Sequence, residues 1–361
     1  MIASLVNFVV SIGIGLFLTP YVVHNIGAEA YGFVGLASTF VGYAQLFTVA
    51  LTSVAGRFIT VAYHEGNELK ANRYYSSTLA ANAVMVFALT IIAIPVILFL
   101  DKLVNISPHL VGDVKMLFTF IFLQFVITTI STVYSVATFV KNKLYLSSIA
   151  NLVFSFVRVA VMVVLFGMLP PKVCYVGLAV CLASAVLTIM NRFYTRVLLP
   201  DISFRWNLVS WASVREMLEA GIWNVVTKLQ QIMMFGLQLL VANLMVSPYL
   251  MGMLSVAQTV PNQISSLTIT VASLFYPEQT KYYAQGKRDE LVDDIKSGMK
   301  VSGFFTNIVF VVLLVVGYDF MRLWQHGQDT TLLYELLTLT MLGLLASGVA
   351  VTLQNLPLIV N

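Results

Sequence analysis

Three basic residues stand where the sequence is otherwise apolar. Arg158 and Lys228 lie inside long apolar stretches, and Arg57 lies at the end of another. A cationic side chain at the centre of a bilayer costs about 2.5 to 3.5 kcal/mol on insertion scales, so it is usually retained for a function. Arginine can also bind two oxygens of one phosphate. If the three side chains face one space, they predict a substrate-binding site for an anionic, diphosphate-like group.

Each of these cations also has a purely structural explanation. Arg57 and Lys228 are close enough to a predicted membrane surface for their long side chains to reach the lipid headgroups. Arg158 could instead donate hydrogen bonds to the carbonyl groups of a neighbouring helix. These alternatives stay open from the sequence alone.

Amide side chains near a proline form a second candidate group. Gln258, Asn262 and Gln263 flank Pro261 in the second half of the chain. Such amides suit sugar hydroxyls, but hydrogen bonds between helices explain them equally well. A proline inside a span frees a carbonyl group and permits a bend, which predicts a hinge at Pro261. Pro20 is predicted as a second hinge, or as a helix end.

The composition tells which elements must position these residues. Of 361 residues, 59% are hydrophobic and only 10% are charged, whereas soluble domains have about 25% charged residues. The mean hydropathy is +0.89. Apolar runs of about twenty residues match the roughly 30 Å core of a bilayer. The chain is therefore predicted to be an all-α polytopic membrane protein.

About ten membrane spans are predicted, and the pattern of spans and loops repeats after about 220 residues. Residues 1–190 form an N-lobe of six helices, 191–219 a cytoplasmic connector, and 220–361 a C-lobe of four. This predicts two pseudo-symmetric lobes of a six-plus-six type, with about 60 to 80 residues of the second lobe absent from the sequence. The predicted spans are 2–23, 32–57, 76–100, 114–140, 144–168, 173–190, 220–246, 252–276, 297–316 and 331–353.

The loops predict the orientation of the chain. Most of the 20 lysines and arginines fall in alternate loops, including the connector. By the positive-inside rule, the connector and the N-terminus are predicted to be cytoplasmic. Trp206 and Trp211, between the basic residues of the connector, predict a segment that lies on the cytoplasmic leaflet.

Several function classes lack their usual residues. No Asp or Glu falls in the middle of a predicted span, although a cation-coupled exporter of cationic drugs is expected to carry such a carboxylate. The sequence has no glycine-rich phosphate loop, and its four histidines are far apart. Cys174 and Cys181 lie in an apolar setting, which suits neither a zinc site nor a disulfide. We expect no cofactor, no metal, no nucleic-acid partner and no enzymatic activity; a membrane-embedded glycosyltransferase would need a large outer loop.

Four short motifs carry a resemblance to a known family. They are NIGAEAYGFVGLAS at 25–38 and GRFITVAYHEGNELKANRYYSSTL at 56–79, with echoes at 245–258 and 283–291. Together with the order of the spans, they resemble the polysaccharide-biosynthesis (Wzx-type, O-antigen) flippases. That family belongs to the multidrug/oligosaccharidyl-lipid/polysaccharide exporter superfamily.

The resemblance implies both a mechanism and a location. It implies two six-helix lobes around a central cavity that opens alternately to either side. The substrate would be an undecaprenyl-pyrophosphate-linked oligosaccharide, moved from the inner to the outer leaflet of a bacterial inner membrane. Implied partners are this lipid-linked glycan, membrane lipids and other polysaccharide assembly proteins. Two alternatives stay open: a cation-coupled multidrug (MATE-type) exporter, and a lipid II flippase, whose first-span arginines are missing from 2–23.

Overall fold

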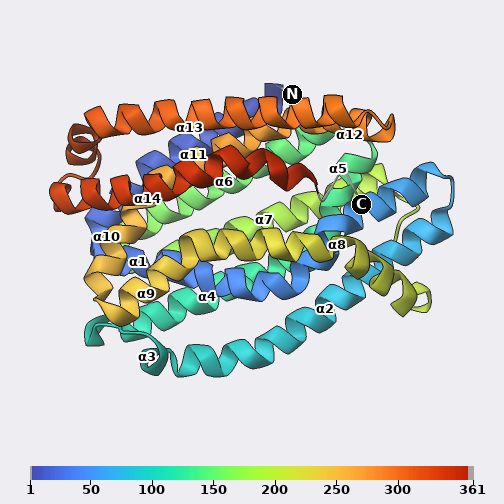
Figure 1. Ribbon diagram of the computed structural model, residues 1–361. Helices are drawn as coiled ribbons and strands as arrows, with labels where there is room; N and C mark the ends of the chain where they lie inside the picture. Colours follow the sequence, from blue (N-terminus) through green and yellow to red (C-terminus); the bar gives the residue numbers. More distant parts are fainter. Residues whose placement is uncertain (1, 357–361) are drawn as a thin grey trace. The chain divides into compact units, whose positions relative to one another are not determined.

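The computed structural model of the protein describes residues 2–356, and the side chains of 2–8, 235, 354 and 355 are outside the description (Figure 1). Every regular element in this part of the chain is helical. The α-helices are α1 (Ile2–His64), α2 (Glu68–Leu98), α3 (Leu100–Leu103), α4 (Val111–Ser131), α5 (Val136–Val140), α6 (Leu144–Met168), α7 (Cys174–Leu198), α8 (Trp211–Gln231), α9 (Leu237–Met245), α10 (Pro248–Ala257), α11 (Thr259–Ser273), α12 (Tyr276–Ala284), α13 (Arg288–Trp324) and α14 (Thr330–Ala350). Short 3₁₀ turns are η1 (Pro108–Leu110), η2 (Thr132–Ser135), η3 (Trp206–Leu208) and η5 (Val351–Asn355), and η4 (Ile232–Gly236) is a π-helix.

Within residues 2–356, eight helical segments are long and apolar enough to cross a membrane. The difference from the ten predicted spans has two sources. Helix α1 counts once although it bends at Gly27, and the predicted eighth span is divided into α10 and α11, each too short to count. The structure confirms the predicted all-helical membrane protein.

The bend in α1 lies at Gly27, seven residues after the predicted hinge Pro20. Gly27 has φ 83° and ψ 160°, a conformation that glycine adopts without the steric cost of a side chain. The helix continues through Pro20. Beside the bend, the hydroxyl groups of Thr19 and Tyr31 are 3.2 Å apart and hydrogen-bonded. Pro20 therefore lies inside a helix, and any movement there stays a prediction.

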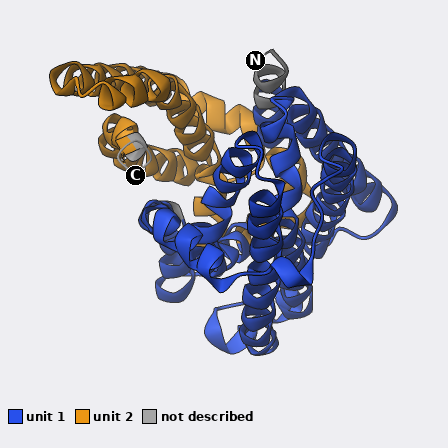
Figure 2. Ribbon diagram, turned by 90° about the vertical axis from the view of Figure 1, so that its right-hand side faces the viewer, with its two compact units in different colours: residues 1–18, 33–248 blue, residues 19–32, 249–361 orange. Residues whose placement is uncertain are grey.

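The described chain groups into two compact units (Figure 2). Unit 1 contains residues 1–18 and 33–248, and unit 2 contains 19–32 and 249–361. These boundaries differ from those of the predicted lobes, because α8 and α9 group with unit 1. The predicted six-plus-six lobes concern membrane topology and stay a prediction.

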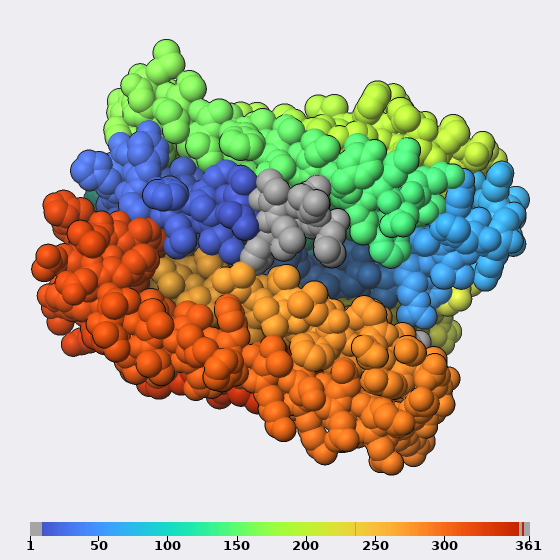
Figure 3. Space-filling view, turned by 90° about the horizontal axis from the view of Figure 1, so that it is seen from above, coloured from blue at the N-terminus to red at the C-terminus, as the bar shows by residue number. Residues whose placement is uncertain are grey.

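Unit 2 combines residues 19–32 of α1 with α10 to α14, and small and hydroxyl side chains pack inside it. Thr306 packs against Gly348, and its hydroxyl oxygen lies 3.4 Å from that of Thr268 on α11. Helix α13, in orange in Figure 3, lies at the surface and exposes Phe304 (70%) and Val315 (77%). Apolar side chains exposed in the middle of a long apolar helix are expected to face lipid.

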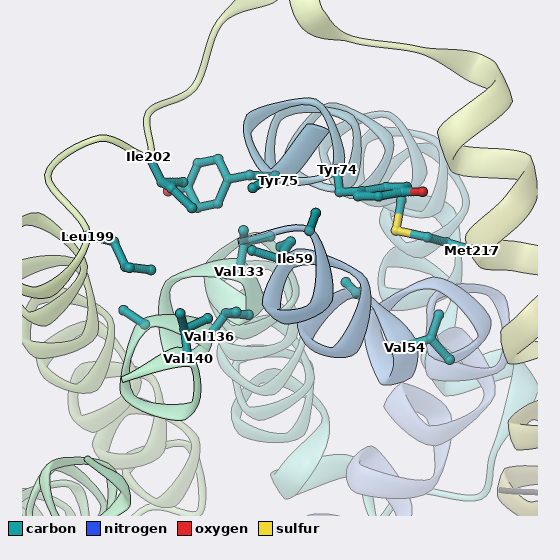
Figure 4. Packing of buried hydrophobic residues seen from close by; sticks show 14 of the residues in the cluster. Val54, Ile59, Tyr74, Tyr75, Val133, Val136, Val140, Leu199, Ile202 and Met217 are labelled. Carbon is teal, nitrogen blue, oxygen red and sulfur yellow. The ribbon is translucent and has the colours of Figure 1, made fainter. Parts of the chain in front are cut away.

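One apolar core of unit 1 lies where α1, α2, η2, α5 and α8 meet the connector (Figure 4). Ile59, Tyr74, Tyr75, Val133 and Met217 are buried together there. The Tyr74 ring also packs edge-on against the ring of Phe58. This core joins segments that are far apart in the sequence, so the connector is part of the folded unit.

Hydrogen bonds from α2 hold the irregular part of the connector. The buried side chain of Asn72 accepts a bond from the Ser203 amide (2.8 Å) and donates one to the Asp201 carbonyl oxygen (3.0 Å). The hydroxyl oxygens of Ser76 and Ser77 accept bonds from the amides of Arg205 (3.0 Å) and Ser210 (2.9 Å). Helix α7 runs on to Leu198, so the irregular stretch is shorter than the predicted connector.

Trp206 and Trp211 of the connector are 76% and 74% exposed. Two exposed indoles beside basic residues are compatible with contact to lipid headgroups. The predicted position on the cytoplasmic leaflet stays a prediction.

Replacing Asn72 by alanine should loosen the connector. The change leaves the Ser203 amide and the Asp201 carbonyl group without their buried partner, which costs about 1 to 3 kcal/mol. We expect a lower melting temperature of the detergent-solubilised protein. The neighbouring Arg73→Ala change alters an exposed side chain and serves as the control. Equal melting temperatures for both variants would show that these bonds do not hold the connector.

Candidate functional site

The site begins with close packing between α1 and α8 in unit 1. Gly221 lies directly on the backbone of α1, and a Cβ atom there would come within 1.7 Å of the Ala50 carbonyl oxygen. One turn on, the Asn224 side chain donates a hydrogen bond to the Ser53 hydroxyl oxygen at 2.9 Å. Lys228 follows Gly221 by seven residues, so it lies on the same face of α8. The packing therefore directs Lys228 towards α1.

Lys228 lines a cavity of about 180 Å³ within unit 1. The cavity lies between α1, α4, η2 and α8. Its other walls carry hydroxyl groups, one amide and one apolar side chain. Its lining residues are Gln45, Thr48, Val49, Thr52, Thr128, Thr129, Thr132 and Lys228.

The charge of this cavity is positive. Lys228 is half-buried, and its ammonium group has no hydrogen bond or ion pair with any side chain that the structure describes. No carboxylate is among the lining residues. Because charges interact more strongly in a medium of low dielectric constant, an unpaired ammonium in a membrane helix favours an anion and repels a cation.

Four of the five threonine hydroxyls are already bonded within their helices. Thr52 donates to the Thr48 carbonyl oxygen at 3.0 Å, and Thr132 donates to that of Thr128 at 2.9 Å. Such bonds satisfy a hydroxyl in an apolar helix at little cost. Each hydroxyl can turn to donate to a ligand instead, and its oxygen can also accept a bond from a sugar hydroxyl.

Arg57 lines a different cavity of unit 1. This cavity has a volume of about 200 Å³ and lies near the end of α1, beside Lys70, Tyr74 and Glu216. The Tyr74 hydroxyl donates to the Glu216 carboxylate at 2.7 Å. Arg57 is exposed and makes no ion pair with the described side chains. The cavity has mixed charge, so it discriminates less sharply between anions and cations.

Arg158 lines neither cavity. It lies in α6, is half-buried, and its Nε atom is buried in unit 1. The structure thus places the three predicted cations at three separate positions. Only Lys228 lies in a polar cavity free of carboxylates, and a role of Arg158 in binding stays a prediction.

The predicted amide group lies in unit 2, where a helix is interrupted. Helix α10 ends at Ala257 and α11 begins at Thr259. Pro261 explains this break, because it has no N–H group to donate to the carbonyl group four residues earlier. Gln258, at the break, is buried, whereas Gln263 is half-buried and Asn262 is exposed. Their predicted contact with substrate and the hinge at Pro261 stay predictions.

Sequence reasoning missed the threonines of the Lys228 cavity. Thr48 and Thr52 are four residues apart, as are Thr128 and Thr132. That spacing puts each pair on one helix face. Repeated threonines at this spacing, in spans otherwise made of aliphatic side chains, were the signal that could have found them.

A π-helix begins four residues after Lys228, directly after the end of α8. Ile232–Gly236 adopt this wider turn between α8 and α9. Gly236, at its end, packs against Thr39 of α1, where a Cβ atom would lie 2.6 Å from Cγ2. Single π turns inside α-helices are frequent at functional sites.

The comparisons with known proteins concern the fold first. The chain is similar to the eukaryotic MATE transporter AtDTX14, with a TM-score of 0.73 and 10% identity, over 98% of this chain and 79% of the other. An inward-facing multidrug resistance MATE family transporter of the MOP superfamily matches with a TM-score of 0.71 and 14% identity, over 97% and 82%. The chain has the fold of the MATE transporters. At these identities the likeness concerns the fold alone.

No protein-family model matches the sequence. A curated relative, the uncharacterized membrane protein EpsK of Bacillus subtilis (strain 168), is 29% identical over 330 residues. The match covers 91% of this chain and 65% of EpsK. This chain therefore spans about two-thirds of the length of that relative.

The packing of Gly221 can be tested against a matched glycine. Replacing a helical glycine by alanine normally stabilises a helix by up to about 1 kcal/mol. Gly343 of α14 has open space around it, so Gly343→Ala should be neutral or stabilising. Gly221→Ala should instead lower the melting temperature in detergent, because the new methyl group meets the Ala50 backbone. Stabilisation by both changes would contradict the close contact.

Proposed function

We propose that this protein is a flippase that moves an undecaprenyl-pyrophosphate-linked oligosaccharide from the inner to the outer leaflet by alternating access. The observation that carries this proposal is the Lys228 cavity, with one ammonium group, several hydroxyls and no carboxylate among its lining residues. The ammonium suits a phosphate oxygen, and the hydroxyls and Gln45 suit further phosphate oxygens or a sugar.

The fold supports a membrane transporter without selecting its substrate. A MATE-type multidrug exporter fits the fold equally well, since the similar structures include one. The cavity favours the anionic substrate, because a cationic drug bound there would meet an unneutralised ammonium group. A lipid II flippase also carries a pyrophosphate lipid, but the first span of this chain has no arginine.

The proposal includes a location and an order of binding. The protein would act in the bacterial inner membrane, with a cytoplasmic N-terminus. Arg57 is exposed whereas Lys228 is half-buried, so Arg57 would meet the pyrophosphate first, and Lys228 would hold it deeper in the membrane. Gln258, Asn262, Gln263 and Arg158 would contribute to the glycan path in other states of the cycle.

Neutralising Lys228 should stop transport of an anionic lipid. A hydrogen bond to a charged group contributes about 1.5 to 3 kcal/mol, which corresponds to a loss of roughly tenfold or more in binding. We expect Lys228→Gln to lose surface glycan in a complementation assay, and Lys228→Arg to retain part of it. The exposed Lys296→Gln variant is the control, with membrane levels checked by blotting.

The double variant Arg158→Ala, Lys228→Ala is the strongest form of this test. If surface polysaccharide persists while the variant protein is present in the membrane, the anionic site is wrong. A loss of drug resistance alone would instead identify the multidrug exporter.

A carboxylate placed in the cavity should act through charge. Thr52→Asp sets an anion beside Lys228, so it should neutralise the cavity and abolish glycan export. Thr52→Asn has nearly the same shape without the charge and should retain most activity. Similar activity in the two variants, measured in the same complementation assay, would show that the sign of the charge in this cavity does not select the substrate.

A further inference from the structure

Unit 1 contains an apolar cavity that the proposed headgroup site does not use. Its volume is about 270 Å³, and it lies between α1, α2 and α4. Apart from the ring of Tyr43, its lining residues are all aliphatic or phenyl side chains and alanines. The wall is braced by aromatic contacts, with the rings of Phe40 and Phe118 edge to face at 5.5 Å. An apolar hollow of this kind leaves its wall atoms without dispersion partners unless something fills it.

The apolar cavity and the Lys228 cavity are neighbours along the same two helices. On α1, Ala44 and Phe47 line the apolar cavity, while Gln45 and Thr48 line the cationic one. On α4, Phe122 borders the first cavity and Thr128 borders the second. With a rise of 1.5 Å per residue, the centres of the two lining segments are offset by about 10 to 15 Å along these helices.

The apolar cavity is expected to open towards the hydrocarbon of the membrane. Phe47 is 66% exposed and Ile92 is 60% exposed, and both lie inside membrane-spanning helices. Exposed apolar side chains in that position are expected to face lipid chains. A hydrocarbon chain can therefore enter this cavity from the bilayer while its polar end stays beside Lys228.

We propose that this cavity binds the first part of the hydrocarbon chain of the transported anionic lipid. The proposal rests on the proposed function, because it needs the phosphate group of the lipid at Lys228. The occupant is this chain, because its head is bound only about 10 to 15 Å away, whereas a bulk acyl chain has no such tether. Head and chain would be held on adjoining faces of α1, which orients the lipid for its passage between leaflets.

The physical advantage of such a site is orientation. Lipid hydrocarbon is as apolar as the cavity, so moving a chain from one to the other gains little hydrophobic free energy. The gain comes from shape and from the covalent link, which makes binding of the second part of the ligand intramolecular. Filling the cavity should thus lower the binding affinity of long-chain ligands only, and by a moderate factor.

The test compares ligands of different chain length on the full chain in phosphatidylcholine nanodiscs. The ligands are inorganic pyrophosphate, farnesyl pyrophosphate, a longer polyprenyl pyrophosphate and uncharged farnesol. Ala93→Phe fills the cavity, and Ala44→Leu fills it more mildly in case the larger side chain prevents folding. Ala88→Phe adds the same ring on an exposed position of α2 outside the cavity and is the matched control. Lys228→Gln tests the headgroup site.

We expect Ala93→Phe and Ala44→Leu to weaken the binding of the prenyl pyrophosphates by about fivefold or more, because they overfill an apolar site. The binding of inorganic pyrophosphate should stay unchanged. Lys228→Gln should weaken the binding of every pyrophosphate ligand. If the cavity variants bind like Ala88→Phe while Lys228→Gln still weakens all pyrophosphates, the chain site is wrong and the proposed function stands.

Two further outcomes separate the remaining explanations. If Lys228→Gln leaves all pyrophosphates unchanged, the headgroup site fails, and the chain site that depends on it fails as well. If the cavity variants weaken farnesol as much as farnesyl pyrophosphate and Lys228→Gln changes neither, the cavity is a general site for bilayer lipid, which also overturns the proposal.

Discussion

The contact between Gly221 and the backbone of Ala50 determines how the site of unit 1 is built. Without a side chain at Gly221, α8 can lie directly on α1, and a Cβ atom would force the two helices apart. The same face of α8 carries Asn224, bonded to Ser53, and Lys228. The absence of a side chain at Gly221 thus determines that Lys228 faces the polar cavity.

An unpaired ammonium group in a membrane helix is unfavourable by itself. The surrounding threonines reduce this cost, because their dipoles can solvate the charge while the hydroxyl hydrogens of four of the five stay bonded to the helix backbone. A carboxylate partner would solvate the ammonium better, but it would also cancel the positive potential. The arrangement in unit 1 therefore keeps Lys228 tolerable and still able to attract an anion.

The sequence predicted the membrane helices well, because an apolar run of span length has few other stable structures. It predicted their ends less well. Helix α2 begins at Glu68 and α13 at Arg288, several residues before the predicted spans, since polar residues also form helix outside a bilayer. The predicted loop after Tyr276 contains helix α12 for the same reason.

The candidate site was only partly predictable. Lys228 stands out as a charge in an apolar run, whereas threonine is compatible with any span and carries no signal alone. Arg57 was expected beside Lys228, but it follows Thr52 by five residues, which is about 140° around the helix, so it faces another cavity. The break before Pro261 follows from its missing N–H group, and the bend at Gly27 lies in the interval 24–31 that separates the first two predicted spans.

The π-helix at Ile232–Gly236 has a consequence for how unit 1 can change shape. A π turn holds one residue more than an α turn. When the π turn converts to α-helix, the extra residue becomes part of the neighbouring α-helix. One residue corresponds to about 100° of rotation. Helix α8 can therefore rotate relative to α9 while the helix stays continuous. Such a rotation would move the Lys228 ammonium group from one environment to another.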